Sequence, residues 1–392
     1  MKITAIRTKI IQEGFRNGLF TFIDTDEGIT GVSEVMMRRK NKTVETHIGE
    51  LARFLVGRDP TCVEDNFEKM YRDSFWVGGT LHATALSAVD IAMWDIRGKV
   101  LNAPVYRLLG GPCRDEILVY CHVPGGANPE EFAANALEAK GRGFKAFKTT
   151  IPLLYGTDKG VEGYSGWSSD RYRRLKETEY LPAGFLKRIG EFFAAARQAV
   201  GGEMEIGLDC HGRLNCANAV RLCEILEPYD LMFVEEPIPP EDDRALDFVI
   251  QRSPIPIASG ERLATIYDAR RFLARPGLAM LQCDVVNCGG ITTMKKIAAM
   301  AEAAYVAMAP HNPNGPLCTA ASVQICAAIP NFMILETIGS REDARLAKEI
   351  LSNPLEITNG VIRVPQGPGL GVDVNDDIFA RGHKYRPFEG WR

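Results

Sequence analysis

The sequence lacks several features that would assign the protein to a specialised class. Its ten cysteines include no Cys-x-x-Cys pair, which excludes the usual zinc-ribbon and thioredoxin-like motifs. No stretch reaches the roughly 18 apolar residues of a membrane-spanning helix, and residues 1–9 carry no signal-peptide apolar core. The net charge is −4 without a basic tail or stripe, so neither nucleic acid nor an anionic membrane is an expected partner. We expect a cytoplasmic protein that binds a small molecule.

The patterns that are present predict two kinds of structure along the chain. The 392 residues, 46% hydrophobic and 24% charged, suffice for one large barrel and a smaller domain. The first 35 residues predict strands and a hairpin with Glu27-Gly28 at its turn, and residues 83–100 have the apolar periodicity of a helix. We interpret residues 1–115 as a separate α+β domain, to which residues 365–392 return.

Residues 116–364 alternate between predicted strands and helices. Eight apolar runs are interpreted as strands, and eight is the strand number of a TIM barrel. The predicted fold class is therefore α/β, a modified TIM (β/α) barrel with an added α+β domain. The expected strand ends are near Tyr120, Thr150, His211, Glu236, Glu261, Val285, His311 and Glu336.

A long polar segment, residues 151–182, follows the second predicted barrel strand. Loops of this length in compact domains are usually functional, so we expect a lid over the site. A surface insertion without a role is the alternative, because loops tolerate insertions.

Three acidic residues stand 26 positions apart, and each closes an apolar run: Asp209, Glu235 and Glu261. A step of 26 residues fits one strand and one helix of a barrel, which places all three carboxylates at the carboxyl ends of neighbouring strands. Three converging oxygen ligands suit a hard divalent cation, for which we predict Mg²⁺. The alternative is that each acid is only a helix N-cap, which is common after a strand. Their shared register favours the metal site.

Two histidines and one further acid stand at strand ends of the predicted barrel. Asp284 and His311 lie one strand apart, so the carboxylate could fix the imidazole tautomer and make His311 a general base. His211 lies two residues beyond Asp209, and strand alternation would turn both to the same face. His211 is thus either a fourth metal ligand or a general acid. We favour the acid, because three carboxylates already balance the cation.

Two more charged side chains are expected to point into the mouth of the barrel. Glu336 ends the eighth predicted strand, and Lys148 lies on the second. An isolated lysine or glutamate is usually a solvated surface residue. Lys148 and Glu336 are therefore site candidates only because of their positions on predicted barrel strands.

With these residues the chain resembles the enolase superfamily, in its mandelate racemase-like branch, and most of all its acid-sugar dehydratases of the galactonate type. The resemblance covers nearly the whole chain and implies a capping domain at 1–115, completed by 365–392, and a homo-oligomer between dimer and octamer. The motifs that carry it are Gly207-Leu-Asp-Cys-His-Gly-Arg213, Phe233-Val-Glu-Glu-Pro237, Ala258-Ser-Gly-Glu-Arg262, Cys283-Asp-Val-Val-Asn-Cys-Gly-Gly-Ile-Thr292 and Ala309-Pro-His-Asn-Pro313.

The resemblance also implies roles for the predicted site residues. The three carboxylates at 209, 235 and 261 would bind Mg²⁺, which chelates the substrate carboxylate and stabilises an enediolate. Asp284 and His311 would form the dyad that removes the α-proton, and His211 would be the acid. Glu336 would hydrogen-bond the substrate carboxylate.

The chain departs from the family on the second barrel strand. Many relatives carry Lys-x-Lys there, the second lysine being a base, whereas this chain has Lys148-Thr149-Thr150. Thr150 cannot remove an α-proton, so the face opposite His311 lacks that base. Lys148 is then an electrostatic partner for the carboxylate. A tyrosine of the long segment is the candidate substitute: Tyr155, Tyr164 or Tyr172.

The sequence therefore predicts a hydro-lyase. It would dehydrate an aldonate, such as D-galactonate or D-gluconate, to a 2-keto-3-deoxy sugar acid with Mg²⁺. One alternative is a racemase or epimerase of a 2-hydroxy acid on the same scaffold, against which Thr150 argues because that reaction needs a base on each face. The other is a catalytically silent regulatory barrel, which the metal triad and the dyad oppose.

Overall fold

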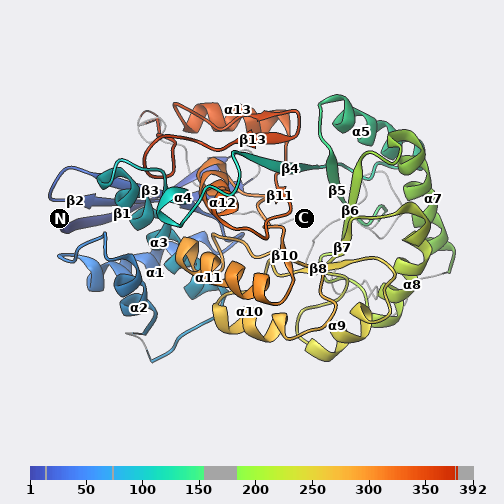
Figure 1. Cartoon of the computed structure of the whole chain (residues 1–392), viewed down its shortest axis with the longest axis horizontal. Helices are drawn as coiled ribbons and strands as arrows, with labels where there is room; N and C mark the ends of the chain where they lie inside the picture. The colour runs from blue at the N-terminus through green and yellow to red at the C-terminus, as the bar shows by residue number, and fades with distance from the viewer. Residues whose placement is uncertain (14–15, 73–74, 154–182, 376, 378–392) are drawn as a thin grey trace.

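The computed structural model describes residues 1–13, 16–72, 75–153, 183–375 and 377 (Figure 1). Its N-terminal part is an antiparallel sheet, in which β1 (Ile3–Glu13) pairs with β2 (Arg16–Thr25) and β2 with β3 (Thr30–Val35). Gly28, with a φ of 80°, makes the turn between β2 and β3, which only glycine adopts readily. The turn expected at Glu27-Gly28 is therefore confirmed.

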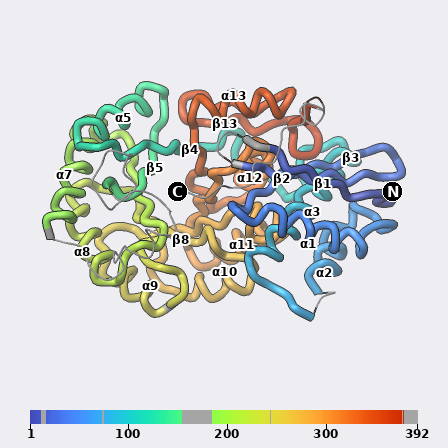
Figure 2. Tube along the Cα trace, turned by 180° about the vertical axis from the view of Figure 1, so that it is seen from behind, coloured from blue at the N-terminus to red at the C-terminus, as the bar shows by residue number. Residues whose placement is uncertain are grey.

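Helices cover this sheet and join it to the rest of the molecule. α3 (Thr80–Val100) is buried over most of its length because it packs against β3 on one side and against a barrel helix, α11, on the other. Its neighbours in the two views of the molecule are α1 and α2 (Figures 1 and 2). The remaining N-terminal helices are α1 (Asn41–Leu55), α2 (Val63–Arg72) and the short α4 (Val105–Leu108).

Eight parallel strands form a closed barrel. Neighbours along the chain pair from β4 to β10, and β11 pairs with β4. Met308 of β10 bonds with the backbone of Asn331 and Met333, which lead into β11 and close the ring. The strands are β4 (Glu116–His122), β5 (Ala146–Thr150), β6 (Glu205–Asp209), β7 (Phe233–Glu235), β8 (Ile257–Ser259), β9 (Met280–Leu281), β10 (Ala307–Met308) and β11 (Leu335–Glu336).

A helix follows each barrel strand, and the loops between them carry the site. Several helices begin at a polar side chain that accepts a backbone N–H, as Asn128, Asn215 and Thr265 do, which satisfies an otherwise unpaired donor. These helices are α5 (Pro129–Gly141), α7 (Ala183–Val200), α8 (Cys216–Leu226), α9 (Asp243–Ile250), α10 (Ile266–Leu273), α11 (Gly290–Ala303), α12 (Pro316–Ala328) and α13 (Arg341–Ile350). The α/β barrel with an added domain is confirmed.

The chain then returns along the barrel toward the N-terminal helices. A hairpin of β12 (Ile357–Thr358) and β13 (Val361–Arg363) pairs antiparallel with β4. Beyond it, Leu370 donates its N–H to Asp95 of α3, and Gly369 bridges to Pro104. The domain limits at residues 115 and 364 stay predictions. Among the described helices, none is both long enough and apolar enough to cross a membrane.

Several barrel strands end earlier than the sequence predicts. β8 ends at Ser259, two residues before Glu261, and β9 and β10 each end three residues before Asp284 and His311. Gly260 has a φ of 136° and Pro310 has no N–H to donate, so neither continues a ladder. The predicted site residues therefore lie in the first turns beyond the strands.

Candidate active site

Lys148 forms ion pairs with three carboxylates of the site at the carboxyl ends of the strands. Its side chain is 3% exposed, and its Nζ lies 2.8 Å from Glu235, 2.9 Å from Glu336 and 3.3 Å from Asp209. The ring of Tyr120, 5.6 Å from Nζ, packs beneath it. The surrounding carboxylates outweigh burial and raise the pKa of Lys148 well above its ordinary value. Lys148 is therefore a fixed cation and not a proton acceptor at neutral pH.

The three acids predicted as metal ligands come from three consecutive strands. Asp209 pairs in register with Glu235, and Glu235 with Ala258, so that β6, β7 and β8 deliver them side by side. Each carboxylate contacts a nitrogen-bearing side chain: Lys148 contacts the first two, and His311 Nε2 lies 3.1 Å from Glu261. Among the described residues, no three metal-binding side chains stand at ligand spacing. Lys148, His211 and His311 lie against these oxygens.

The chemistry of the three carboxylates nevertheless fits a hard cation. Glu235 is fully buried, and its Oε1 has no hydrogen-bond partner in the part of the chain that the structure describes. Burial, and after it the negative charge of Asp209, raises the pKa of Glu235 well above its ordinary value. Three carboxylates with a buried, unsatisfied oxygen are the oxygen donors that Mg²⁺ takes.

The burial of Lys148 among acids leads to a prediction about stability. In the presence of EDTA, Lys148→Met should lower the free energy of unfolding by about 3–5 kcal/mol, because removing one partner leaves buried charges uncompensated. Lys145→Met, at an exposed position beside the same strand, is the matched control and should change stability little. Urea unfolding of both variants measures the free energy of unfolding. Equal values for the two variants would contradict a role for Lys148 in balancing the buried carboxylates.

His211 reaches Asp209 by a route that the sequence interpretation did not foresee. β6 ends at Asp209, and His211 has a left-handed backbone with a φ of 50°. Strand alternation is therefore the wrong explanation for their proximity; a tight turn folds the imidazole back, with Nε2 3.1 Å from Asp209 Oδ2. The backbone N–H of His211 also donates to Asp209 Oδ1. Burial lowers the pKa of His211 against the opposing effect of Asp209.

His311 and Asp284 form the expected pair. His311 Nδ1 lies 2.8 Å from Asp284 Oδ2, and its Nε2 faces Glu261. Burial favours the neutral ring, but Glu336, Glu261 and Asp284 outweigh it and raise the pKa of His311 to about 10. The Asp284 carboxylate also accepts from the backbone of Val286 and from Asn314, so Nδ1 of His311 carries the hydrogen toward it and Nε2 is the nitrogen that exchanges a proton.

Glu336 lies at the junction between Lys148 and a histidine that the sequence interpretation missed. His122, at the end of β4, bonds through Nε2 to Glu336 Oε1, and the backbone N–H of Asn312 donates to Glu336 Oε2. Lys148, His311 and His122 outweigh burial and hold the pKa of Glu336 well below its ordinary value. Glu336 is thus an anion that orients two side-chain donors, Lys148 and His122. The His122 side chain is 38% exposed.

The sequence interpretation also missed two residues that contact acids of the site. Gln282, fully buried, donates its amide N–H to Glu235 Oε2 at 2.9 Å. Arg262 lies 3.1 Å from Glu236 and 3.3 Å from Glu261. Gln282 directly follows β9, which ends at Leu281, so it also lies at the strand end that indicated Asp284.

Thr150 stands where many enolase-superfamily sequences have a lysine base. It pairs in register with Asp209, and alternation along β5 places it on the face of Lys148. On this face β5 therefore offers a hydroxyl and a fixed cation but no lysine base. The candidate tyrosines at 155, 164 and 172, like the proposed lid, lie outside the described residues.

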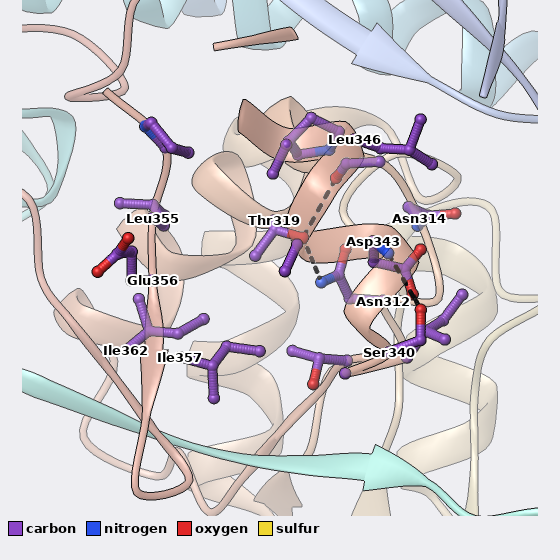
Figure 3. Close-up of a pocket in the computed structure, with 18 of the residues that line it drawn as sticks. Asn312, Asn314, Thr319, Ser340, Asp343, Leu346, Leu355, Glu356, Ile357 and Ile362 are labelled. Carbon is purple, nitrogen blue, oxygen red and sulfur yellow. Dashed lines mark hydrogen bonds between the residues drawn. The ribbon is translucent and has the colours of Figure 1, made fainter. Parts of the chain in front are cut away.

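A separate cavity of about 370 Å³ borders this site (Figure 3). It opens between α12, α13 and the β12–β13 hairpin, with Leu355, Ile357 and Ile362 on one wall and Ser340 and Asp343 on another. It contains none of the eight predicted site residues. It touches the site through Asn312, which bonds Glu336, and Asn314, which bonds Asp284. The chemistry therefore belongs to the barrel mouth and not to this cavity.

Comparisons with known proteins agree with this arrangement. The family described as "Enolase C-terminal domain-like" matches residues 131–378, and the one described as "Mandelate racemase / muconate lactonizing enzyme, N-terminal domain" matches residues 17–110. The chain belongs to the enolase superfamily. It is 35% identical over 396 residues to a D-galactonate dehydratase of Ralstonia pickettii and over 397 residues to one of Pectobacterium atrosepticum. Both alignments cover 100% of this chain and 96% of the relative.

Solved structures of the enolase superfamily have the same fold. A superfamily member from Salmonella Typhimurium superposes with a TM-score of 0.88 at 28% identity, covering 97% of this chain and 98% of the other. An enolase of Agrobacterium radiobacter with bound sodium and L-malate superposes with a TM-score of 0.84 at 29% identity, covering 97% and 95%. With dehydratases among its full-length relatives, the chain is an enzyme of the hydro-lyase class.

Proposed function

We propose that this enzyme dehydrates an aldonate, such as D-galactonate or D-gluconate, to a 2-keto-3-deoxy sugar acid. The relatives named D-galactonate dehydratase support the substrate class because they match the chain over its full length. The L-malate bound by the Agrobacterium structure, a 2-hydroxy acid, supports a site that accepts α-hydroxy carboxylates. The observation that carries the proposal is the geometry of His311 between Asp284 and Glu261.

Asp209, Glu235 and Glu261 are the proposed ligands of Mg²⁺. When bound, such a cation neutralises the substrate carboxylate and lowers the energy of the enediolate that deprotonation creates. Glu261 is one of the acids that raise the pKa of His311, so a cation held by Glu261 would counter that effect and favour a neutral, basic imidazole.

His311 is the proposed base for the proton at C2. Asp284 accepts the Nδ1 hydrogen and keeps the lone pair on Nε2, the nitrogen that faces the proposed metal ligands. His311 Nε2 therefore lies on the side of the site that carries the proposed metal ligands. His311 approaches from the loop after β10, and Lys148 and Thr150 lie on β5.

His211 is the proposed acid that protonates the departing hydroxyl at C3. Hydroxide is a poor leaving group, and proton donation of this kind typically contributes about 10²–10⁴-fold. The contact of its Nε2 with Asp209 requires a hydrogen on Nε2. Burial, which lowers the pKa of His211, makes the protonated ring a stronger acid. In this scheme the base and the acid are different histidines.

Lys148 and His122 are the proposed hydrogen-bond donors for the substrate carboxylate, and Glu336 orients both. This modifies the role that the family resemblance implies for Glu336. A carboxylate held as an anion cannot donate a hydrogen bond to another carboxylate, whereas its two partners can. The expected homo-oligomer, dimer to octamer, also stays a prediction.

Substrate stereochemistry tests this one-base proposal. Thr150 leaves the face opposite His311 without a lysine base, so only one configuration at C2 should lose its proton, and we expect the 2R configuration of D-galactonate and D-gluconate. A screen of C2-epimeric aldonate pairs for 2-keto product, with and without EDTA, measures this. We expect turnover of one member of a pair and inhibition by EDTA. Similar turnover of both members would require a second base and would favour the racemase alternative.

A further inference from the structure

Asp284 is held by more than its histidine partner. Its Oδ2 accepts from Asn314 Nδ2 at 2.9 Å and from Asn287 Nδ2 at 3.3 Å, and its Oδ1 accepts from the backbone of Val286 at 2.9 Å. Asn287 lies three residues beyond Asp284 on the same loop. Its amide therefore ties the orientation of the carboxylate to the conformation of that loop. His311 depends on the same oxygen for its orientation.

Asn287 is in turn fixed by a residue 203 positions away in the chain. Thr84, fully buried on α3, has its Oγ1 2.9 Å from Asn287 Oδ1 and 2.7 Å from the backbone oxygen of Thr80. The amide of Asn287 must turn Nδ2 toward the ionised Asp284, which leaves Oδ1 facing Thr84 as an acceptor. Thr84 Oγ1 lies against both oxygens and has one hydrogen, which must point toward Asn287 Oδ1 for that contact to be attractive, because two facing acceptors would repel each other.

The same helix and its sheet also anchor both loops that carry the dyad. From α3, Ser87 accepts the N–H of Gly289 at 2.9 Å and Asp90 accepts that of Thr292 at 3.0 Å, at the start of α11. From β3, Glu34 accepts the N–H of Leu317 at 3.0 Å, at the start of α12. α11 follows Asp284 and α12 follows His311, so the N-terminal part of the chain holds both halves of the pair.

We propose that Thr84 and Asn287 are positioning residues of the Asp284–His311 dyad. The Thr84 hydroxyl fixes the Asn287 amide, the amide fixes the Asp284 carboxylate, and the carboxylate orients the imidazole. A helix outside the barrel thereby sets the alignment of the base. The alignment affects deprotonation and not metal or substrate binding, because neither residue reaches the proposed metal ligands or the carboxylate donors. This inference rests on the proposed role of His311 as the base.

The test compares Thr84→Val, which has the same shape but no hydroxyl, with Thr84→Ser, which restores it. We expect Thr84→Val to lower kcat by about 10-fold or more, the range for partners behind a catalytic group, with KM and the Mg²⁺ affinity within about twofold of wild type. Thr84→Ser should return kcat to within about threefold. Asn287→Leu, which removes the same connection on the loop, should reduce kcat at least as much.

Two controls separate positioning from general loop anchoring. Ser87→Ala removes a bond to the same loop without touching Asn287, and we expect a lower melting temperature with kcat within about twofold of wild type. In the double variant Thr84→Val/Asn287→Leu, kcat should be no lower than in Asn287→Leu, because both act along one path. A loss of kcat in Ser87→Ala equal to that in Thr84→Val, or multiplicative losses in the double variant, would overturn the proposal.

A spectroscopic readout keeps this test independent of the substrate. The proton between His311 Nδ1 and Asp284 should give a far-downfield ¹H resonance in the ligand-free protein. We expect Thr84→Val to shift or broaden that resonance and Thr84→Ser to restore it. An unchanged resonance in Thr84→Val would refute the positioning role. A wild-type enzyme that turns over no aldonate would refute the proposed function alone.

Discussion

His311→Asn is expected to abolish both dehydration and exchange of the C2 hydrogen with solvent. His311 Nε2 faces Glu261 while its Nδ1 is bonded to Asp284, and asparagine keeps a polar group of similar reach without a basic nitrogen. Loss of the base should reduce turnover by at least about 10²–10⁴-fold. ¹H NMR of an aldonate in D₂O follows both processes, since exchange removes the C2 signal even when no water is lost.

The matched variant is His211→Asn, at the other histidine of the site. Because its Nε2 contacts Asp209 and it is proposed as the acid, dehydration should fall by a similar factor while C2 exchange by His311 continues. The two variants thus separate deprotonation from departure of the hydroxyl. Exchange at the wild-type rate in His311→Asn would mean that another group is the base, and Tyr155, Tyr164 and Tyr172 would be tested next.

Glu235→Gln is expected to remove most of the activity by weakening the proposed metal site. Glu235 is the central acid of the three, fully buried, with contacts to Lys148 and Gln282 and one unsatisfied oxygen. Losing an anionic ligand should weaken Mg²⁺ binding and cost several kcal/mol of enediolate stabilisation, which is about 100-fold or more in kcat/KM. Calorimetric titration with Mg²⁺ and steady-state rates measure the two effects.

Glu205→Gln is the control for Glu235→Gln, because Glu205 is an exposed acid at the start of the neighbouring strand β6. It should change neither Mg²⁺ affinity nor rate by more than about twofold. Turnover by Glu235→Gln in the presence of EDTA would contradict the assignment of this triad.

Much of the barrel could be predicted from the sequence because its signal is local and repeated. Apolar runs about 26 residues apart, each closed by a polar residue, indicate strand and helix units and place their ends on one side. The eight predicted strands correspond to β4–β11. Several predicted strand ends differ from the observed ones by a few residues. Gly260 and Pro310 end the ladders of β8 and β10 before the site residues are reached.

The rest of the site depends on contacts that periodicity does not encode. His211 was placed beside Asp209 for the wrong reason, because its left-handed turn is a property of the folded loop. His122 ends β4, two residues beyond the strand end that the sequence predicts near Tyr120, so the prediction misses it. The central place of Lys148 arises from three acids on other strands, and the Thr84–Asn287 contact joins residues 203 positions apart. A single sequence gives no signal for either.

The central claim is that this chain is a one-base, Mg²⁺-dependent dehydratase of aldonates. ¹H NMR of D-galactonate and of D-gluconate with the wild-type protein and Mg²⁺ in D₂O tests it most directly. The account predicts loss of at least one substrate to a 2-keto-3-deoxy acid that carries one solvent deuterium at C3, and no reaction in EDTA. Recovery of substrate deuterated at C2 and epimerised would instead identify a racemase, and unchanged substrate across an aldonate library despite measured Mg²⁺ binding would contradict the account.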